Sequence, residues 1–166
     1  MNKAEIVCDT TVLLYLGRIN HAQLLPALFE PIFIPKTVML ELDAGRLLRP
    51  DTIDPHNVDW VTSVEVTPSE MNALPPNHLG RGERAVIAYA YAHTGCIAGL
   101  DDLQARMFAE ELGLKVIGTI GVLIKAKQTG VIRSIRELLQ NLQQQGFHVS
   151  PELHKEALRL VGEQQE

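Results

Sequence analysis

One stretch of the chain, residues 79–106, limits the fold more than any other, because it alternates backbone turns with short apolar segments. It reads LGRGERAVIAYAYAHTGCIAGLDDLQAR. After the glycine turn, residues 84–93 are apolar on nearly every side, which predicts a helix sandwiched between other layers. Gly95 is placed to end that helix. Residues 96–100 are too short and too apolar for a solvent-facing helix and predict a buried parallel strand.

Carboxylates stand at the joints of this stretch. Glu83 opens the helix, and Asp101 and Asp102 follow the strand. Each acid has an ordinary structural explanation, since helix dipoles favour acids in the first turn and Asp commonly caps a helix. In open α/β sheets, however, binding and catalytic residues usually lie at the carboxyl ends of the parallel strands. A functional reading therefore requires further acids that converge on the same place.

Two such acids occur upstream. A short apolar strand ends at Asp9, which Thr10 and Thr11 follow, and a helix that begins after Pro35 carries Glu41. The predicted strands are residues 5–8, 31–34, 96–100 and 115–118, and residues 58–66 are predicted as a strand or an extended segment. The predicted helices are residues 12–16, 21–30, 36–44 (closed by Gly45), 84–93, 102–112, 119–128, 134–145 and 151–161.

Alternating short strands and helices predict an α/β fold with a short parallel sheet and helices on both faces. The absence of linkers and repeats predicts one domain over residues 1–166, with a core of about 4–130 and C-terminal helices of about 131–162. No apolar run approaches the roughly 20 residues that cross a bilayer. The N-terminus lacks a signal-peptide pattern. Cys8 and Cys96 lie in apparent strands without metal-type spacing, which indicates a reducing cytoplasm.

Charge is unevenly distributed along the chain. The net charge is −5, whereas residues 103–136 carry six basic residues against two acids, a local +4 that leaves −9 for the remainder. This pattern can create a basic flank beside an acidic pocket, although a solvated helical surface is the commoner explanation. Arg106, Lys125 and Lys127 are the candidate phosphate contacts on this flank.

Acids gathered at one sheet edge would repel one another strongly. At 4 Å, a like-charge pair costs about 1 kcal/mol in water and about 4 kcal/mol at an effective dielectric of 20. A fold accepts such a cluster when protons or cations neutralise it. Carboxylate oxygens select hard cations, so the expected cofactor is Mg²⁺ or Mn²⁺.

The motifs resemble those of PIN-domain proteins, the family that includes VapC-type toxins of toxin–antitoxin pairs. More closely, the chain is similar to a PIN-like branch with the signature GERxAIxxA, DDxxAR and GTxGxLxxAKxxG. The corresponding segments here are GERAVIAYA at 82–90, DDLQAR at 101–106, GTIGVLIKAKQTG at 118–130, CDTTVLLYL at 8–16 and IPKTVMLEL at 34–42.

The resemblance implies a three-layer α/β/α sandwich and a cytoplasmic, metal-dependent endoribonuclease that acts as a toxin. The implied catalytic and metal-binding acids are Asp9, Glu41, Glu83 and one of the Asp101–Asp102 pair. Adjacent residues on a strand point to opposite sides, so the doublet leaves the fourth acid open. Thr11 matches a position that supports the first acid. The implied partners are an RNA substrate, a small antitoxin protein and a second copy in a homodimer.

The same residues argue against several other classes of protein. A haloacid-dehalogenase phosphatase requires Asp-x-Asp where this chain has Asp9-Thr10-Thr11, and no P-loop or GxGxxG occurs. A response-regulator receiver would carry its acid pair early, whereas the pair here comes late. The remaining alternative is a PIN-like module that binds RNA or a protein without cleavage. The apolar stripe Ile135, Leu138, Leu139 and Leu142 either forms a dimer face or covers the chain's own core.

Overall fold

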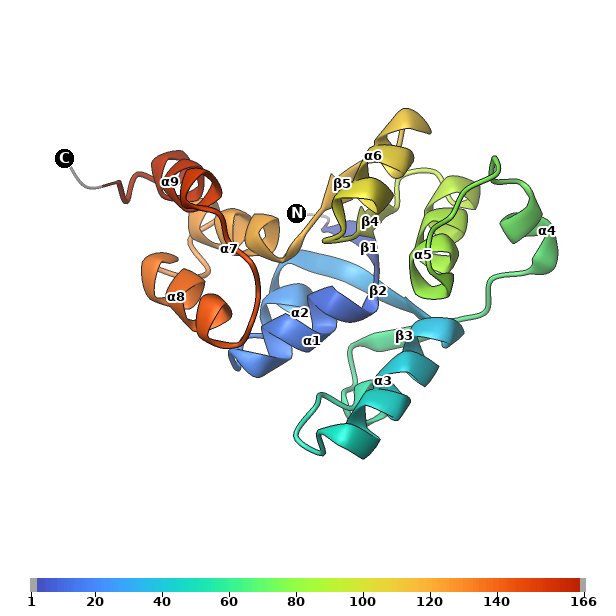
Figure 1. Ribbon diagram of the computed structural model, residues 1–166, viewed down its shortest axis with the longest axis horizontal. Coiled ribbons are helices and arrows are strands. Elements are labelled where there is room, and N and C mark those ends of the chain that lie inside the picture. The colour runs from blue at the N-terminus through green and yellow to red at the C-terminus, as the bar shows by residue number, and fades with distance from the viewer. Residues whose placement is uncertain (1–2, 165–166) are drawn as a thin grey trace.

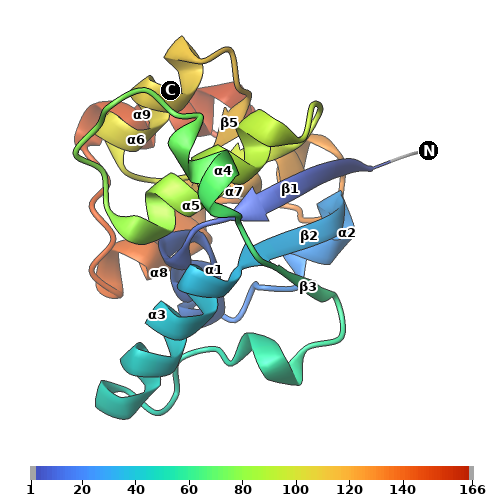
Figure 2. The ribbon, with the colours of Figure 1, turned by 90° about the vertical axis from the view of Figure 1, so that its right-hand side faces the viewer.

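Five short strands form one parallel sheet in the computed structural model, which describes residues 3–164 (Figures 1 and 2). The strand order is β3-β2-β1-β4-β5, and every neighbouring pair is parallel. The strands are β1 (Ala4–Cys8), β2 (Phe29–Pro35), β3 (Val61–Val64), β4 (Ile97–Gly99) and β5 (Val116–Ile117).

Helices connect the strands and cover both faces of the sheet. They are α1 (Thr10–Arg18), α2 (Leu24–Leu28), α3 (Lys36–Leu48), the 3₁₀ turn η1 (Pro55–Asn57), α4 (Pro68–Asn72), α5 (Arg81–Ala92), α6 (Leu103–Glu111), α7 (Thr119–Gln128), α8 (Arg136–Gln144) and α9 (Pro151–Leu160). Figures 1 and 2 place α4 and α5 on one side of the sheet and α1, α7 and α8 on the other. The predicted α/β class, with its parallel sheet between helical layers, is confirmed.

The core explains why the central helix is apolar all round. Ala85, Val86, Ile87, Ala88 and Ala90 of α5 are all buried, because this helix packs against the sheet and is covered by its neighbours. The stripe on α8 is also internal: Ile135, Leu139 and Leu142 are fully buried, and Leu138 nearly so. These side chains cover the chain's own core, so the stripe is not free to form a dimer face.

The strand order fixes where a site can form. From β1 the chain winds outward through β2 and β3, and then returns to build β4 and β5 on the other side of β1. The winding therefore changes direction between β1 and β4. In open α/β sheets the crevice outside the carboxyl ends of the strands at such a switch point is the usual ligand site. Asp9 follows β1 there, and Asp101 and Asp102 follow β4.

Some predicted boundaries were wrong, for reasons that lie in tertiary packing. The helix predicted over residues 21–30 ends at Leu28, since Phe29 pairs with Ala4 of β1 and begins β2. Gly45 does not close α3, which continues to Leu48. Within residues 58–66, predicted as a strand or an extended segment, the strand is limited to β3, and α4 and η1 were not predicted. Among residues 3–164, no helix is long and apolar enough to cross a membrane.

Candidate metal centre

A pocket at the carboxyl ends of β1 and β4 collects acidic side chains from separate elements. Its volume is about 410 Å³. It is lined by Asp9, Thr10, Thr11, Glu41, Gly80, Gly82, Glu83 and Asp102. Four of these residues are carboxylates, and they come from the β1–α1 joint, α3, α5 and the β4–α6 joint. Acids that are up to 93 positions apart in the chain (Asp9 to Asp102) therefore face one small volume.

Asp9 is fixed in place by the strand that precedes it and the helix that follows it. Its backbone N–H donates to Gly99 O at 2.9 Å, and its carboxylate caps α1 by accepting from Thr10 N at 2.8 Å. The hydroxyl of Thr10 then donates to Oε2 of Glu41 at 2.5 Å. Thr10 thus joins the first acid to the second, a role that the sequence motif did not single out.

Gly82 occupies the first turn of α5, where it faces these two acids. A Cβ on this residue would lie 2.9 Å from Oδ1 of Asp9 and 2.8 Å from Oε1 of Glu41. Real Cβ atoms essentially never come so close to other heavy atoms, so any larger residue would displace the carboxylates. In the same turn Glu83 accepts a hydrogen bond from Gly80 N at 3.2 Å, which closes the helix start. The glycine turn therefore brings a third carboxylate to the pocket without crowding the other two.

The two aspartates after β4 have different surroundings. Asp102 lines the pocket and caps α6 by accepting from Ala105 N at 3.0 Å. Asp101 instead accepts from both the N–H and the hydroxyl of Thr119, each at 2.7 Å. Both oxygens of Asp101 are thus used to hold the start of α7. Thr119, the second residue of the GTIGVLIKAKQTG segment, was predicted only to start the helix over residues 119–128, and its contact with Asp101 was not predicted.

Burial and mutual repulsion raise the pKa of two pocket acids. Asp9 is only 6 % exposed, and its burial is the main reason that its pKa rises to about 7. The charges of Glu41, Glu83 and Asp101 raise it further, while the hydrogen bond from Thr10 N opposes the rise. The pKa of Glu83 is also raised, first by burial and then by the charges of Asp102 and Glu41. Both shifts arise mainly from burial, and the neighbouring carboxylates add to them.

The donor set fits a hard divalent cation. It consists of carboxylate oxygens together with Thr11, whose hydroxyl is buried without a hydrogen-bond partner. The space in front of Gly82 is kept open by the missing Cβ. No three of the pocket acids bring donor atoms within 4.8 Å of one another. This spread suits Mg²⁺, which usually keeps several waters and takes one or two carboxylates directly.

A tighter group of donor atoms lies elsewhere. Asp43, Asp54 and His56 place donor atoms within 4.8 Å of one another. The guanidinium of Arg46 contacts Asp43 and lies 3.5 Å from Asp54, and His56 Nδ1 lies 2.9 Å from Asp54. A resident cationic side chain therefore already compensates this cluster. We interpret it as an ion-paired connection between α3 and the segment before β3.

The three predicted phosphate contacts have different environments. Lys125 lies over the ring of Phe29 at 5.2 Å, and Lys127 contacts Arg133 O and lies 3.5 Å from Glu163. Both are near the C-terminal end of α7, whereas its first residue, Thr119, is the one bound to Asp101. Arg106 has a different neighbour: its Nη1 and Oδ1 of Asp101 both approach the same side of Gly118.

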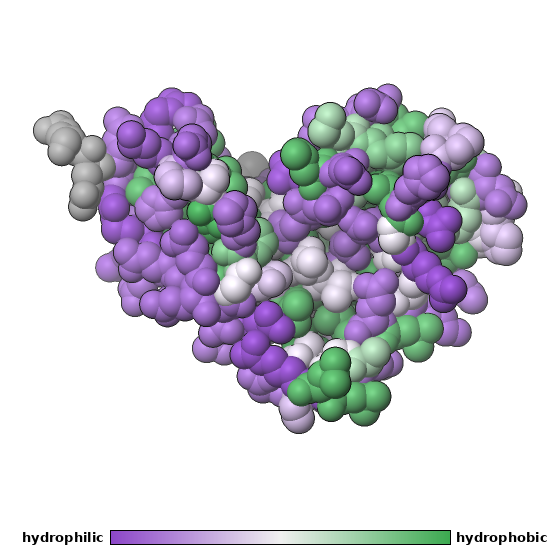
Figure 3. All heavy atoms as spheres, viewed as in Figure 1, coloured by the Kyte–Doolittle hydropathy of each residue, from purple (hydrophilic) through white to green (hydrophobic). Residues whose placement is uncertain are grey.

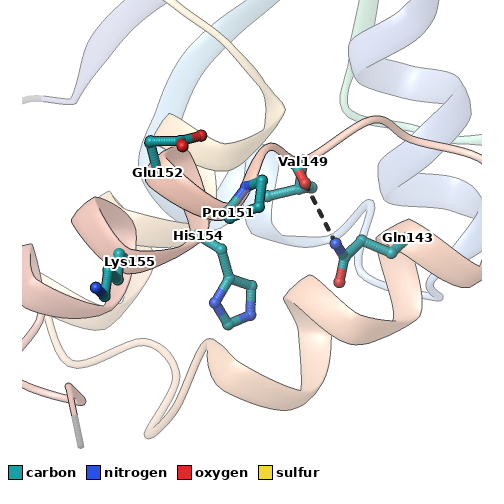
Figure 4. A pocket seen from close by; sticks show the side chains of 6 residues that line it. All are labelled: Gln143, Val149, Pro151, Glu152, His154 and Lys155. Atoms are coloured by element: carbon teal, nitrogen blue, oxygen red, sulfur yellow. Dashed lines mark hydrogen bonds between the residues drawn. The ribbon is translucent and has the colours of Figure 1, made fainter.

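A second hollow lies between α8 and α9 and is lined by Gln143, Val149, Pro151, Glu152, His154 and Lys155 (Figure 4). Gln143 donates to Val149 O at 3.3 Å across it. It contains one acid and mixed side chains, and none of the sequence motifs contributes to it. The acidic pocket is therefore the better candidate for chemistry.

A parallel α/β fold with an acidic pocket at its switch point is typical of cation-binding proteins. Comparison with known proteins identifies the family. The chain matches the family model described as PIN domain over residues 5–163. It belongs to the PIN-domain family, as its motifs predicted. A search of curated proteins finds no match. PIN domains are a nuclease-type family that typically uses divalent metal ions and acts on nucleic acid.

Proposed function

We propose that this protein is a metal-dependent endoribonuclease that hydrolyses RNA phosphodiester bonds. The observation that carries the proposal is the pocket at the switch point, where Asp9, Glu41, Glu83 and Asp102 come together from four elements. Structural carboxylates usually acquire a basic partner, whereas two of these acids are buried beside other carboxylates, and both conditions raise their pKa values. This arrangement costs stability, and a cation-dependent function gives a reason for it.

In this proposal Mg²⁺ or Mn²⁺ would bind among the four pocket acids, with one or two of them as direct ligands and the others acting through bound water. The bound ion would polarise the scissile phosphate, lower the pKa of a water and stabilise the leaving oxygen. Thr10 holds Glu41 toward the pocket through its 2.5 Å hydrogen bond. The hydroxyl of Thr11 is a buried donor without a hydrogen-bond partner beside the first acid. Asp101 has a supporting role and is not a ligand in this proposal, because both of its oxygens accept hydrogen bonds from Thr119.

Substrate binding requires positive charge beside the acids. Arg106 is the predicted contact nearest to them, and Arg81, the exposed first residue of α5, adjoins the two glycines that line the pocket. Lys125 and Lys127 are engaged by Phe29 and Glu163, so we assign them a weaker share of RNA binding. Contacts of this kind to phosphates carry affinity without sequence selection.

The activity test compares wild-type protein with Asp9→Asn on a pool of structured RNA in Mn²⁺, alongside filter binding of the same RNA. Asparagine keeps the shape of the side chain and its cap on α1 but removes the ligand charge. We expect cleavage by wild type, nearly complete loss of cleavage in Asp9→Asn, and similar RNA affinity in both. Asp59→Asn is a matched control, because Asp59 is exposed and lies outside the pocket.

The alternative function is a PIN-like module that binds RNA or a protein without cutting. It would be favoured if wild type and Asp9→Asn both bound the RNA pool and left it equally intact. Metal-dependent affinity that persists without any cleavage product would point the same way.

The biological setting that we propose is a cytoplasmic toxin paired with a small antitoxin protein. The family assignment supports this setting, and the two free, buried cysteines are compatible with a reducing compartment. Expression of the wild-type chain should arrest growth, whereas Asp9→Asn should not. A neighbouring small reading frame whose product relieves the arrest would identify the antitoxin. Equal growth with both chains would contradict the toxin role and leave the nuclease chemistry to the test above. A homodimer belongs to the same proposal.

A further inference from the structure

Helix α7 begins without a capping side chain of its own. Its N-cap residue is Gly118, which offers no side-chain acceptor to the unpaired N–H groups at the start of the helix. Asp101 takes over this role from the β4–α6 joint, by accepting from the N–H of Thr119 at Oδ1 and from its hydroxyl at Oδ2, each at 2.7 Å. Thr119 is fully buried. A single carboxylate therefore connects the end of β4 to the start of α7 through a residue that solvent does not reach.

The missing side chain at Gly118 leaves room for an arginine beside this carboxylate. A Cβ on Gly118 would lie 2.8 Å from Oδ1 of Asp101 and 2.9 Å from Nη1 of Arg106, so the two atoms are close neighbours. The guanidinium is nevertheless not paired with Asp101. Across residues 3–164, it forms no ion pair and no hydrogen bond with another side chain or with the backbone. Arg106 is half-buried, and a charged group in such a place is unfavourable without a partner.

The hydrogen bonds of Asp101 explain why these neighbouring charges stay apart. A guanidinium binds a carboxylate most strongly through two parallel hydrogen bonds, which use both carboxylate oxygens. Thr119 already occupies both oxygens of Asp101 with its N–H and its hydroxyl. The strongest arrangement is therefore closed to Arg106, and its five N–H donors remain available to a different acceptor.

We propose that Thr119 is a positioning residue for RNA binding: by holding both oxygens of Asp101, it keeps the guanidinium of Arg106 free for a phosphate of the substrate. Thr119 is buried and cannot touch RNA itself, so it acts only through the two charged residues. A phosphate supplies the acceptor that Arg106 lacks in the chain, and its oxygens fit the guanidinium fork as a carboxylate does. The inference rests on the proposed function, because it takes RNA as the ligand.

Arg106 also lies in a suitable part of the molecule for such a contact. It is one turn along α6 from Asp102, the residue that caps this helix and lines the acidic pocket. Figure 1 places the start of α7 beside β5 and α6, and Figure 3 shows the surface notched between this part of the molecule and α9. The α8–α9 side of the notch is mostly hydrophilic. A phosphate held by Arg106 would therefore lie close to the acidic pocket, along an open and polar part of the surface.

The test measures binding of the structured RNA pool in Mn²⁺ at several salt concentrations. All chains in this test carry Asp9→Asn, so that the RNA stays intact. Thr119→Val keeps the shape of the buried side chain but removes its hydroxyl, which frees Oδ2 of Asp101 for the guanidinium of Arg106. We expect RNA affinity to fall severalfold and the slope of log K against log salt to fall by about 1, as for the loss of one phosphate contact. Thr119→Ser keeps the hydroxyl and should bind RNA like its parent.

Thr129→Val is the matched control, because it removes a threonine hydroxyl at the other end of the same helix, where the group donates to Lys125 O and Ala126 O. It should leave the slope unchanged. The decisive comparison adds Arg106→Ala. In the Thr119→Val chain this second substitution should reduce the slope little further, because the guanidinium has already been withdrawn from RNA. If Thr119 only caps α7, Arg106→Ala should reduce the slope equally in both backgrounds.

Urea melts of the metal-free chain test the same rearrangement without RNA. Arg106→Ala should leave the unfolding midpoint of the otherwise wild-type chain nearly unchanged, because the guanidinium has no partner there. In Thr119→Val it should lower the midpoint by about 0.3–0.5 M urea, because it removes the new ion pair with Asp101. Thr119→Ala repeats both measurements if the valine variant does not fold.

Three results would each overturn the proposal and leave the nuclease intact. They are a Thr119→Val chain with the parental slope, a Thr119→Ser chain that binds as weakly as Thr119→Val, and equal effects of Arg106→Ala in both backgrounds. Failure of the nuclease has a different signature, because wild type would leave RNA uncut while Thr119→Val still weakened binding. If the Asp9→Asn parent bound no RNA at any salt concentration, both the RNA substrate and this role of Thr119 would be overturned.

Discussion

A methyl group on Gly82 would lie 2.8 Å from Oε1 of Glu41. The same methyl group would lie 2.9 Å from Oδ1 of Asp9. The absence of a side chain at Gly82 therefore allows the carboxylates of Asp9 and Glu41 to approach the start of α5, which carries Glu83. Glycine inside a helix costs roughly 1 kcal/mol relative to alanine. The chain tolerates this cost in the one turn where a side chain would occupy the pocket.

This relationship predicts that Gly82→Ala separates metal binding from folding. In wild type, Mn²⁺ at a hundredfold excess over Kd should stabilise the fold by about 2.7 kcal/mol. In Gly82→Ala the displaced carboxylates should reduce that response by at least half, while the cooperative melt remains. Thermal melts with and without Mn²⁺ measure both effects.

Gly45→Ala is the matched control, because Gly45 is also inside a helix but has no atom within 4 Å of an added Cβ. It should keep the full metal response and gain up to about 1 kcal/mol of stability. A Gly82→Ala protein with a wild-type response to Mn²⁺ would contradict the proposed ligand arrangement.

The sequence carries local information about the site but not its packing. A short apolar strand followed by an acid is a local pattern, and it located Asp9 and the Asp101–Asp102 pair at strand ends. The choice within the pair depends on Thr119, 18 residues further along, whose hydroxyl and N–H bind Asp101. No local pattern contains that contact.

The charged and apolar surfaces show the same limit. Lys127 looked free for a phosphate because its partner, Glu163, is remote in sequence. The exposed leucines of α3 were missed because Gly45 was expected to end the helix before Leu47. Conversely, the leucines of α8 suggested an interface, whereas packing against the core buries them. Periodicity identifies an apolar face but not the surface that covers it.

The two aspartates after β4 should respond differently to the same substitution. Asp102→Asn should abolish most of the Mn²⁺-induced stabilisation at little cost to the metal-free fold, since asparagine also caps a helix well. Asp101→Asn should cost about 1–2 kcal/mol of stability, because two charge-assisted hydrogen bonds to Thr119 become neutral ones. The Asp101→Asn protein should retain most of the Mn²⁺-induced stabilisation. The reverse pattern would make Asp101 the ligand.

Phosphate binding should depend more on Arg106 than on Lys127. Arg106→Ala is expected to weaken RNA binding and reduce the slope of log K against log salt by about 1. Lys127→Ala should change that slope little and instead cost about 1 kcal/mol of stability, since its ammonium group binds Arg133 O and Glu163. Filter binding at several salt concentrations, together with urea melts, distinguishes the two. If both variants reduced the slope of log K against log salt equally, Lys127 would also contact RNA phosphates.

The pKa of Asp9 predicts an unusual pH dependence of the metal-free fold. In the unfolded chain this carboxyl titrates near its ordinary value of 3.8, whereas burial and neighbouring acids raise its pKa to about 7 in the fold. Between these values the folded state binds a proton that the unfolded state has lost. The free energy of unfolding should therefore fall as pH rises from about 4 to about 7, by an amount on the order of a few kcal/mol. Glu83, whose pKa is also raised, contributes in the same direction.

Asp9→Asn should remove most of this slope, because its amide does not titrate, and it should be more stable than wild type at pH 7.5 without metal. Saturating Mn²⁺ should flatten the wild-type slope as well, since the cation replaces the proton as the source of positive charge. Urea melts at several pH values between about 4.5 and 7.5 measure the slopes, with Asp59→Asn as the control at an exposed carboxylate. Parallel profiles for wild type and Asp9→Asn would show that Asp9 ionises normally in the fold, and the acids would then not form the crowded, uncompensated cluster on which the proposed metal centre rests.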